Sequence, residues 1–471
     1  MKKYSDEKTN GRIIMAQKYK QLHFVTLQSL VNWSVAHLIN RDLGFTKKFP
    51  FARIGDVITR STLLIHVEDD VLYKQVTVKT NGGGAVLRNK NLELGKNIGT
   101  KTQYLAREGQ FIMSKIDARN GAFGIITNEI DGAIVTSDFP LFDVNTKLVH
   151  PFYLYLLSTT KPFIQYAQSC SRGTTNRQRI DVDSFLSQKI PLPSLEEQKN
   201  IVSTYNAKIE QANIYSLCTY RINKKIEDYL HNILETNIEF DISGSFLNYV
   251  NYKDISRWDA LFLLSNNNIK SKYPLATLGQ CISHFLTDQN GKSLRRETYK
   301  TPEKEYTYIG MENVKKETGE IIDNVIVKGK DIKSQTIYVP SNYFLYGKLR
   351  PYLNKYWYNN IEKQQEEIIC SSEFFVFDIK NNINSKYFLY VLASYIVQKQ
   401  IIDAMSGARM PRISEETFRG IQIPLPPLNI QNEIVEHIDV LRKEQKDLQQ
   451  KNLTLRQQAT QQFEQTIFSV I

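Results

Sequence analysis

Side chains that can contact DNA are concentrated in one short segment of the chain. Residues 172–179 read Arg-Gly-Thr-Thr-Asn-Arg-Gln-Arg, so three arginines, an asparagine and a glutamine lie within eight residues. Arginine can bond to guanine O6 and N7 or to phosphate, and asparagine or glutamine can bond to adenine N6 and N7. A shorter segment, 407–412, contains Arg409 and Arg412. These residue types predict contacts with DNA.

Further basic clusters lie between the candidate strands. Aromatic residues interleaved with one of them, Tyr352, Tyr356, Trp357 and Tyr358, can pack against sugars and bases. Taken singly, each cluster also fits a solvated basic face, and Arg179 also fits a structural ion pair. Together the clusters favour a DNA-binding surface on each half of the chain. The predicted DNA-contacting residues are Arg88, Lys90, Lys115, Arg119, Asn120, Arg172, Thr174, Asn176, Arg177, Arg179, Lys292, Arg295, Arg296, Lys348, Arg350, Lys355, Arg409 and Arg412.

Motifs for catalysis or for metal binding are missing from the sequence. The string Gly95–Lys101 is one residue short of the P-loop pattern, and Gly82–Gly84 fits a hairpin tip better than a phosphate cradle. The seven histidines include no H-E-x-x-H, and the four cysteines include no C-x-x-C pair. We therefore predict that the chain is not an enzyme by itself and carries no metal or cofactor of its own.

Charge and length set the class of protein. The 471 residues exceed what one core usually holds, so at least two domains are expected. Lysine and arginine outnumber aspartate and glutamate by 60 to 49, a net charge of +11 that favours a polyanionic partner. Residues 1–193 hold 26 basic and 16 acidic side chains, whereas residues 237–426 hold 24 and 21. The first half should therefore dominate any non-specific binding to DNA.

An internal repeat decides the organisation of the chain. The segment from Ile190 to Val202 (IPLPSLEEQKNIV) recurs 233 residues later, from Ile423 to Val435 (IPLPPLNIQNEIV), with 8 of 13 positions identical. The same offset pairs Lys115 with Lys348, and Arg179-Ile180 with Arg412-Ile413. A repeat of this length is a domain with an appendage, because solenoid units are far shorter.

Each repeat changes character at its I-P-L-P string. Before it, short apolar runs such as 71–78, 111–116, 133–135 and 374–379 predict strands of a mixed α/β domain. After it, 195–234 and 428–468 contain no glycine or proline, so each predicts one helix of about 60 Å. Ser194 and Glu197 form a capping box for the first helix, and Pro427 stands at the equivalent place of the second.

Apolar residues on both helices follow a coiled-coil spacing, with Gln445 and Asn452 at polar positions of the seam. We therefore expect the two helices to pack on each other; the alternative is that each covers its own domain. The predicted helix-pair residues are Val202, Tyr205, Ile209, Ala212, Ile222, Ile226, Ile438, Leu441, Leu448, Asn452, Leu455 and Ala459.

The predicted fold class is α+β, with two tandem mixed α/β domains spaced by two long helices in a pseudo-twofold duplication. No stretch is apolar enough to cross a bilayer, and no secretory signal is visible, so a cytoplasmic protein without a membrane partner is expected. The predicted divisions are a polar extension (1–29), a first domain (30–193), a central helix (194–236), a second domain (237–426) and a C-terminal helix (427–471).

The order of domain, I-P-L-P-x-L-x-x-Q, long helix, repeated once, resembles the specificity (S) subunit of type I restriction-modification systems. The strings 111–122, 137–140 and 308–311, and Arg412-Ile413 before Phe418, are similar to that family as well. The resemblance covers the chain from about residue 30 to its end. It implies two target-recognition domains, each reading half of an asymmetric bipartite DNA site, with an antiparallel helix pair between them. It also implies docking of two methyltransferase subunits, which recruit restriction/translocase subunits, so AdoMet, ATP and magnesium would belong to these partners.

Two other classes of function compete with this interpretation. One is a stand-alone sequence-specific DNA nuclease or methyltransferase, which the missing catalytic motifs disfavour. The other is a coiled-coil adaptor that does not bind DNA, which the basic clusters disfavour. The DNA sequence that would be read cannot be deduced, because it depends on the geometry of loops.

Overall fold

The computed structural model describes residues 43–172, 178–240, 267–286, 301–323, 325–332, 335–361, 367–405 and 409–468. The predicted extension 1–29 lies outside these residues. The chain divides into two compact units. Unit 1 combines the residues up to Ile214 with those from Lys451 onward, and unit 2 runs from Tyr215 to Gln450. Both long helices therefore contribute one part to each unit.

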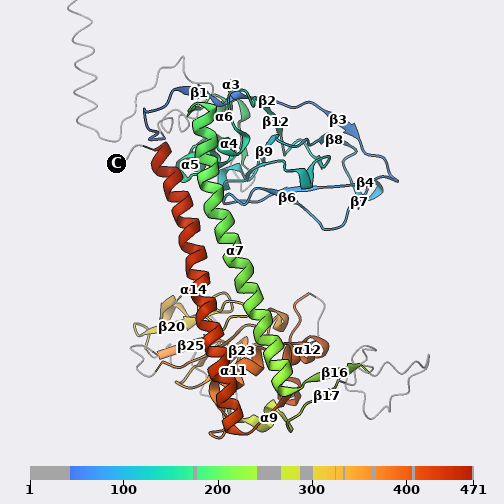
Figure 1. Cartoon of the computed structure of the whole chain (residues 1–471), viewed down its shortest axis with the longest axis vertical. Helices are drawn as coiled ribbons and strands as arrows, with labels where there is room; N and C mark the ends of the chain where they lie inside the picture. The colour runs from blue at the N-terminus through green and yellow to red at the C-terminus, as the bar shows by residue number, and fades with distance from the viewer. Residues whose placement is uncertain are drawn as a thin grey trace, which may run out of the picture. The chain divides into compact units, whose positions relative to one another are not determined.

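Unit 1 is built on a four-stranded antiparallel sheet with the order β10-β9-β12-β2. A second sheet has the order β11-β8-β3, and helix α4 contacts α7 through the rings of Phe152 and Tyr205 (Figure 1). The elements are β1 (Phe51–Arg53), α3 (Ile54–Val57), β2 (Ile58–Arg60), β3 (Leu64–His66), β4 (Leu72–Tyr73), β5 (Val76–Val78), β6 (Ala85–Leu87), β7 (Glu93–Leu94), β8 (Thr102–Leu105), β9 (Phe111–Met113), β10 (Phe123–Ile125), β11 (Ile134–Val135), β12 (Leu141–Val144), α4 (Pro151–Ser158), α5 (Lys161–Ser169), β13 (Ser171–Arg172), β14 (Arg179–Ile180), α6 (Val182–Leu186) and β15 (Lys189–Pro191).

Unit 2 repeats this plan. Its sheet β24-β23-β26-β19 has the same antiparallel order as β10-β9-β12-β2, and a second sheet runs β21-β20-β25-β22. Its elements are β16 (Asn237–Phe240), β17 (Asn267–Lys270), β18 (Leu275–Thr277), α9 (Leu278–Cys281), β19 (Ile282–Leu286), β20 (Glu305–Ile309), β21 (Val325–Lys328), β22 (Thr336–Tyr338), β23 (Phe344–Gly347), β24 (Tyr356–Tyr358), β25 (Glu367–Ser371), β26 (Phe374–Ile379), α11 (Ser385–Ala393), α12 (Tyr395–Ala404), α13 (Glu415–Gly420) and β27 (Gln422–Pro424).

The central strands are apolar on both faces because both faces are covered. Phe111 and Met113 of β9 enter the core that contains α4 and α5, and Ile112 between them enters a separate core. In β26, Phe375 and Phe377 point into one core, whereas Phe374 and Val376 point into another. Alternate residues of a strand face opposite sides, so a sheet buried on both faces produces a continuous apolar run.

Some predicted strands are shorter than expected. The run 71–78 is not one strand, because it is divided into β4 and β5 at Lys74, whose Nζ donates to the carbonyls of Glu129 and Asp131. The run 111–116 ends as a strand at Met113, since the backbone N–H of Lys115 turns to the carbonyl of Asp138. Sequence periodicity does not show such long-range polar contacts.

The I-P-L-P strings form the edge strands that lead into the long helices. β15 pairs antiparallel with β1, and β27 pairs in the same way with β18. The Tyr153 hydroxyl donates to the Pro191 carbonyl at 2.9 Å, and the Tyr387 hydroxyl donates to the Pro424 carbonyl at 2.8 Å. Each domain thus anchors the start of its helix through a buried tyrosine.

Helices α7 (Leu195–Leu234) and α14 (Leu428–Ile467) contain 40 residues each. The predicted capping box is present, since the Ser194 N–H donates to Glu197 Oε2 at 2.9 Å and the Glu197 N–H donates to Ser194 Oγ at 3.3 Å. In α14, the carbonyl of Pro427 accepts from the N–H groups of Ile430 and Gln431. Within the described residues, no helix has the length and hydrophobicity to cross a membrane.

Candidate nucleic-acid interface

Lys115 and Arg179 meet at the carboxylate of Asp138 in unit 1. The Arg179 guanidinium donates to both Asp138 oxygens at 3.2 Å. The Lys115 N–H donates to the Asp138 carbonyl at 2.8 Å, and the Ile180 N–H donates to the Lys115 carbonyl at 2.8 Å. We call this set of Lys115, Asp138, Arg179 and Ile180 the arginine corner of unit 1. It brings two of the predicted cations together, of which Arg179 is exposed and Lys115 is half-buried.

The same corner occurs in unit 2. Arg412 donates to the two carboxylate oxygens of Glu373 at 2.9 and 3.2 Å. The Lys348 N–H donates to the Glu373 carbonyl at 2.8 Å, and the Ile413 N–H donates to the Lys348 carbonyl at 3.2 Å. The arginine corner of unit 2 is thus Lys348, Glu373, Arg412 and Ile413. Two predicted cations again come together, in the backbone arrangement of unit 1.

The two corners differ in their surroundings. In unit 1, burial lowers the pKa of Lys115, the positive charge of Arg60 lowers it further, and Asp138 raises it. In unit 2, the Lys348 Nζ donates to the Ser372 carbonyl at 2.8 Å and lies 5.0 Å from the centre of the Phe375 ring. In unit 1, strand pairing places Arg60 opposite Phe142. In unit 2, it places Phe285 opposite Phe377, which is the equivalent of Phe142. Phe285 therefore occupies the position that Arg60 has in unit 1. In unit 2 the guanidinium of Arg419 lies over this phenylalanine, 4.4 Å from the centre of the Phe285 ring, so the cation comes from another element than in unit 1.

Other predicted cations flank the corners. The Arg119 Nη1 donates to Gln178 Oε1 at 3.2 Å, and the carbonyl of the exposed Asn120 accepts from Asn81 N–H at 2.7 Å. In unit 2, the N–H of the exposed Arg350 donates to the Pro411 carbonyl at 2.7 Å, next to Arg412.

Lys355 and Arg409 also belong to unit 2 and differ in exposure. Lys355 is half-buried and donates to the Met311 carbonyl, and burial lowers its pKa. Arg409 is exposed, and it precedes the corner residue Arg412 by three positions.

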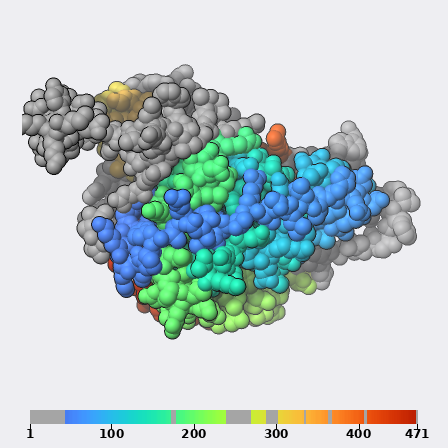
Figure 2. Space-filling model, turned by 90° about the horizontal axis from the view of Figure 1, so that it is seen from above, coloured from blue at the N-terminus to red at the C-terminus, as the bar shows by residue number. Residues whose placement is uncertain are grey.

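Some predicted residues are placed elsewhere or are not described. Arg88 lies at the end of β6, where it donates to Gln75 and Thr77 next to β5, and Lys90 is exposed beyond it. In Figure 2, the residues of the first strands, in blue, form a broad exposed face of unit 1. The side chain of Arg172 and the residues Thr174, Asn176, Arg177, Lys292, Arg295 and Arg296 lie outside what the structure describes.

The predicted aromatic contact surface is wrong for Tyr356. Its side chain is 3% exposed, and its hydroxyl donates to the Glu317 carbonyl at 3.2 Å. Burial raises the pKa of Tyr356 to about 12. Tyr352 is 43% exposed and remains a candidate for contact with a ligand. An aromatic residue in a basic segment gives no sequence signal that separates these two positions.

The helix-pair residues line one face of each long helix. In unit 1, Ala212 is near Asn452, and Tyr205 is hydrogen-bonded to Thr460. In unit 2, Thr219 meets Gln445, and Tyr229 stacks on His437 with ring centres 4.0 Å apart. In both units lower numbers on α7 meet higher numbers on α14, so the helices are antiparallel. Val202, Ala212, Ile222, Ile226, Ile438 and Ala459 are buried, and Tyr205, Ile209, Leu441, Leu448, Asn452 and Leu455 are half-buried.

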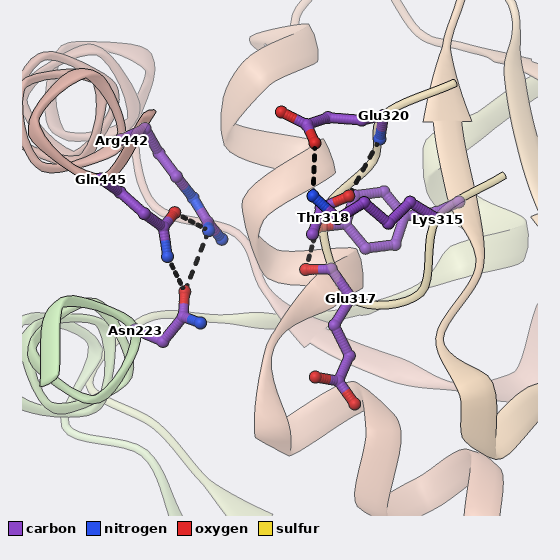
Figure 3. A network of polar contacts seen from close by, with 8 residues as sticks. Asn223, Lys315, Glu317, Thr318, Glu320, Arg442 and Gln445 are labelled. Carbon is purple, nitrogen blue, oxygen red and sulfur yellow. Dashed lines mark hydrogen bonds and ion pairs between the residues drawn. The ribbon is translucent and has the colours of Figure 1, made fainter. Parts of the chain in front are cut away.

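Sequence reasoning missed four polar residues beside this seam. Asn223 bonds to Arg442 and Gln445 in unit 2, and Asn213 bonds to Arg456 in unit 1 (Figure 3 for unit 2). Their positions next to the apolar stripe were visible, but their pairing partner was not. In the described part of the chain, no group of three or more His, Cys, Asp or Glu side chains is placed to hold a metal ion.

Comparisons with known proteins agree with the duplicated architecture. A family model described as the type I restriction modification DNA specificity domain matches residues 47–215 and again 281–455. The HindI type I restriction enzyme specificity subunit of Haemophilus influenzae is 30% identical over 138 residues. This alignment spans 27% of the present chain and only 29% of that relative.

Solved structures are similar over a longer part of the chain but at low identity. The HsdS subunit from Thermoanaerobacter tengcongensis aligns with a TM-score of 0.35 and 15% identity. The type I restriction-modification S subunit from M. genitalium aligns with a TM-score of 0.40 and 14% identity. Both alignments cover 90% of this chain and 98% of the other.

Proposed function

Because the chain belongs to the type I restriction-modification DNA specificity family, whose domain it contains twice, we propose that it selects the DNA target of such a system. Each domain reads one half of an asymmetric bipartite site in double-stranded DNA. The chain is not an enzyme itself. It docks two methyltransferase subunits, which bring restriction/translocase subunits to the DNA, and these partners hold AdoMet, ATP and magnesium.

The observation that carries this proposal is the repeated arginine corner. Lys115, Asp138 and Arg179 in unit 1 have the same backbone contacts as Lys348, Glu373 and Arg412 in unit 2. A shared scaffold supports equivalent placement of both domains on DNA. The different neighbours, Arg60 in one unit and Phe285 in the other, support half-sites of different sequence.

The remaining predicted cations support contact with the DNA backbone around each corner. Arg119 bonds to Gln178 and Arg350 bonds to Pro411, the residues that precede the two corner arginines, and we assign phosphate or base contacts to Arg119 and Arg350 and to Asn120 and Arg409. Phosphate contacts position a protein on the duplex, and contacts to base edges select the sequence. The basic excess of residues 1–193 gives the first half of the chain the stronger non-specific binding to DNA.

The helix pair supports a role as a spacer and as a docking surface. A continuous helix of 40 residues is about 60 Å long, at about 1.5 Å per residue. Its seam is antiparallel in each unit. The outer faces of both helices are exposed and carry, among polar residues, the apolar side chains of Ile214, Leu217 and Tyr220 on α7 and of Val440 and Leu453 on α14. We propose that the length of this pair determines the number of unread base pairs between the half-sites.

The experiment that tests the proposal maps methylated adenines in a host that expresses the chain with its methyltransferase partner. The wild-type chain is expected to give a bipartite motif with two different halves. A second strain carries seven extra residues after Tyr215 and seven after Leu448, which keeps the seam in phase. This insertion lengthens the pair by about 10 Å, which corresponds to roughly three base pairs.

The expected result is two unchanged half-sites with a longer gap between them and some loss of activity. The loss is expected because about three extra base pairs also rotate one half-site by roughly 100° around the duplex. The matched control inserts one residue at each place, which should break the seam and destabilise the pair. An unchanged gap in the seven-residue variant would contradict the spacer role, and a continuous or palindromic motif in the wild type would contradict half-site reading.

A further inference from the structure

In the polar contacts between the two long helices, one helix supplies the hydrogen-bond donors and the other supplies the acceptors. In unit 2, Gln445 donates to Asn223 at 2.7 Å and Arg442 donates to Asn223 at 3.1 Å (Figure 3). Gln445 also donates to the Thr219 carbonyl at 3.4 Å. In unit 1, the Asn452 side chain donates to the carbonyl of Ala212, and Arg456 donates to the Asn213 side chain at 2.6 Å. In each of these contacts α14 supplies the donor and α7 supplies the acceptor.

The duplication makes the two helices comparable residue by residue. α7 begins at Leu195 and ends at Leu234, and α14 begins and ends 233 residues later. At this offset Ala212 corresponds to Gln445, and Thr219 corresponds to Asn452. Helix α7, whose backbone carbonyls accept, therefore has the smaller side chains Ala212 and Thr219 at the positions where α14 has the amides Gln445 and Asn452. Because Gln445 is only 5% exposed, its amide needs the acceptors on α7.

Pairing of two α14 helices would bring like charges together. Asn223 corresponds to Arg456, so the contact between Arg442 and Asn223 would become a contact between Arg442 and Arg456. Asn213 corresponds to Lys446, so Arg456 would also face Lys446. Twofold symmetry would repeat both repulsions. Like-charge contact across an interface is an established way of excluding a wrong partner.

Pairing of two α7 helices would lose the amide donors instead. Gln445 and Asn452 would be replaced by Ala212 and Thr219, which cannot bridge to a carbonyl on the facing helix in the same way. The Thr219 and Ala212 carbonyls are backbone groups of a helix, so this loss is smaller than the charge repulsion between two α14 helices. The rejection is therefore strongest for α14 with itself.

We infer that the contacts of α14 favour pairing with α7 and that like charges on α14 prevent it from pairing with the α14 of a second chain. Repulsion among Arg442, Lys446 and Arg456 opposes the pair of two α14 helices. Hydrogen bonds donated by Gln445 and Asn452 favour the pair of α14 with α7. The two helices descend from one repeat, and their shared apolar seam would otherwise allow like helices of two chains to pair. The inference concerns helix pairing alone and does not rest on the proposed DNA recognition.

The test reverses one charge in the full-length chain. In an Arg456→Glu variant, the new carboxylate would face Arg442 and Lys446 of a second α14, so both repulsions become attractions. The native pair loses the hydrogen bond from Arg456 Nε to Asn452 Oδ1 but keeps a contact at Asn213, because the Asn213 amide can donate to a carboxylate. The expected result is a molar mass that rises from one chain toward two as protein concentration increases, measured by light scattering after size exclusion. High salt should reverse the association.

The matched control is the triple variant Arg442→Glu, Lys446→Glu and Arg456→Glu, which restores like charges and should remain monomeric. Circular dichroism confirms that each variant is folded. A monomeric Arg456→Glu variant, or equal association of the single and triple variants, would overturn the inference. So would a wild-type chain that is already dimeric at the same concentration.

Discussion

The side chain of Gln198 holds the backbone of His150, because its Oε1 accepts a hydrogen bond from the His150 N–H at 2.7 Å. Its Nε2 donates to the carbonyls of Pro193 at 2.8 Å and Leu148 at 3.0 Å. Gln431 makes the equivalent bonds to the Asn384 N–H at 2.8 Å and the Pro426 carbonyl at 2.8 Å. The glutamine of the repeated motif thus fastens the start of each long helix to its domain.

Replacement of this glutamine should destabilise the protein. Gln198 is fully buried, so Gln198→Met leaves backbone groups without partners and should lower the free energy of unfolding by roughly 2 to 4 kcal/mol. Urea unfolding measures the loss, and hydrogen exchange should locate it at the start of α7. The exposed Gln211→Met on the same helix is the control and should have little effect. Equal stability of the two variants would contradict the role of Gln198 in fastening the start of α7 to its domain.

Variants of Arg179 and of its partner Asp138 distinguish a DNA contact of Arg179 from a purely structural ion pair. If the guanidinium contacts DNA, Arg179→Ala should weaken binding and reduce the slope of log affinity against log salt by about one. Asp138→Asn should then retain or strengthen binding, because it releases the guanidinium without removing it. The ion pair is exposed, with side chains 55% and 37% accessible, so neither change should measurably destabilise the fold.

Fluorescence anisotropy with labelled duplex, over a series of salt concentrations, measures this effect. Glu373→Gln and Arg412→Ala form the matched pair in unit 2. A folded Arg179→Ala variant with unchanged salt dependence would remove Arg179 from the DNA surface and leave it a structural ion-pair partner.

Stability should depend on the half-buried carboxyl group of Glu227. Burial raises its pKa, although the Tyr395 N–H donates to it at 3.0 Å and Arg442 is nearby. The folded state therefore binds the proton more tightly than the unfolded state, whose carboxyl has the ordinary value near 4.5. The resulting stability is complete below pH 4.5 and is lost as pH rises through the raised pKa.

Glu227→Gln removes this loss and keeps an oxygen for the Tyr395 N–H. Unit 2 should therefore gain thermal stability over wild type at about pH 7 and gain none near pH 4. Calorimetry at the two pH values measures the difference, with Glu444→Gln, at an exposed position of unit 2, as control. A gain that is equal at both pH values would show that the titration of Glu227 is not its cause.

Two nearby glycines should respond differently to alanine. A Cβ at Gly95 would lie 1.8 Å from the Glu68 carbonyl oxygen, whereas a Cβ at Gly99 meets nothing within 4 Å. Gly95→Ala should cost at least about 2 kcal/mol, because the backbone must shift to make room. Gly99→Ala should remain within about 0.5 kcal/mol of wild type. Chemical denaturation of both variants checks the packing of β4 and β7 in unit 1.

The sequence predicted the helices more fully than the domains. Absence of glycine and proline predicted α7 as 195–234, and the structure has the same bounds. The seam followed from apolar spacing alone. The Asp138 partner of Arg179 lies 41 residues away, and a sequence without an alignment carries no signal for such a pair. The division of 71–78 and the burial of Tyr356 also depend on distant contacts.

The glutamine of the repeated motif is another residue whose contacts could not be predicted from the sequence. Its identity at Gln198 and Gln431 indicated importance but not a role, since the acceptor and donor groups come from a preceding loop and helix. The polar seam residues Gln445 and Asn452 were recognised because they interrupt an apolar stripe. Asn223 and Arg442 were not, because residues at the edge of a stripe look like ordinary solvated positions.

The contribution of α14 to unit 1 has a consequence for biosynthesis. Phe463 and Ile467 belong to the same core as Phe111 and Tyr153, and the Phe45 and Phe468 rings stack with centres 5.1 Å apart. These residues follow the whole of unit 2 in the chain, so the ribosome makes them after it. Domains usually mature in the order in which they emerge. Here the unit that starts first cannot complete its core until the second has been translated, and a released chain that ended at residue 450 would contain all of unit 2 but lack part of the core of unit 1.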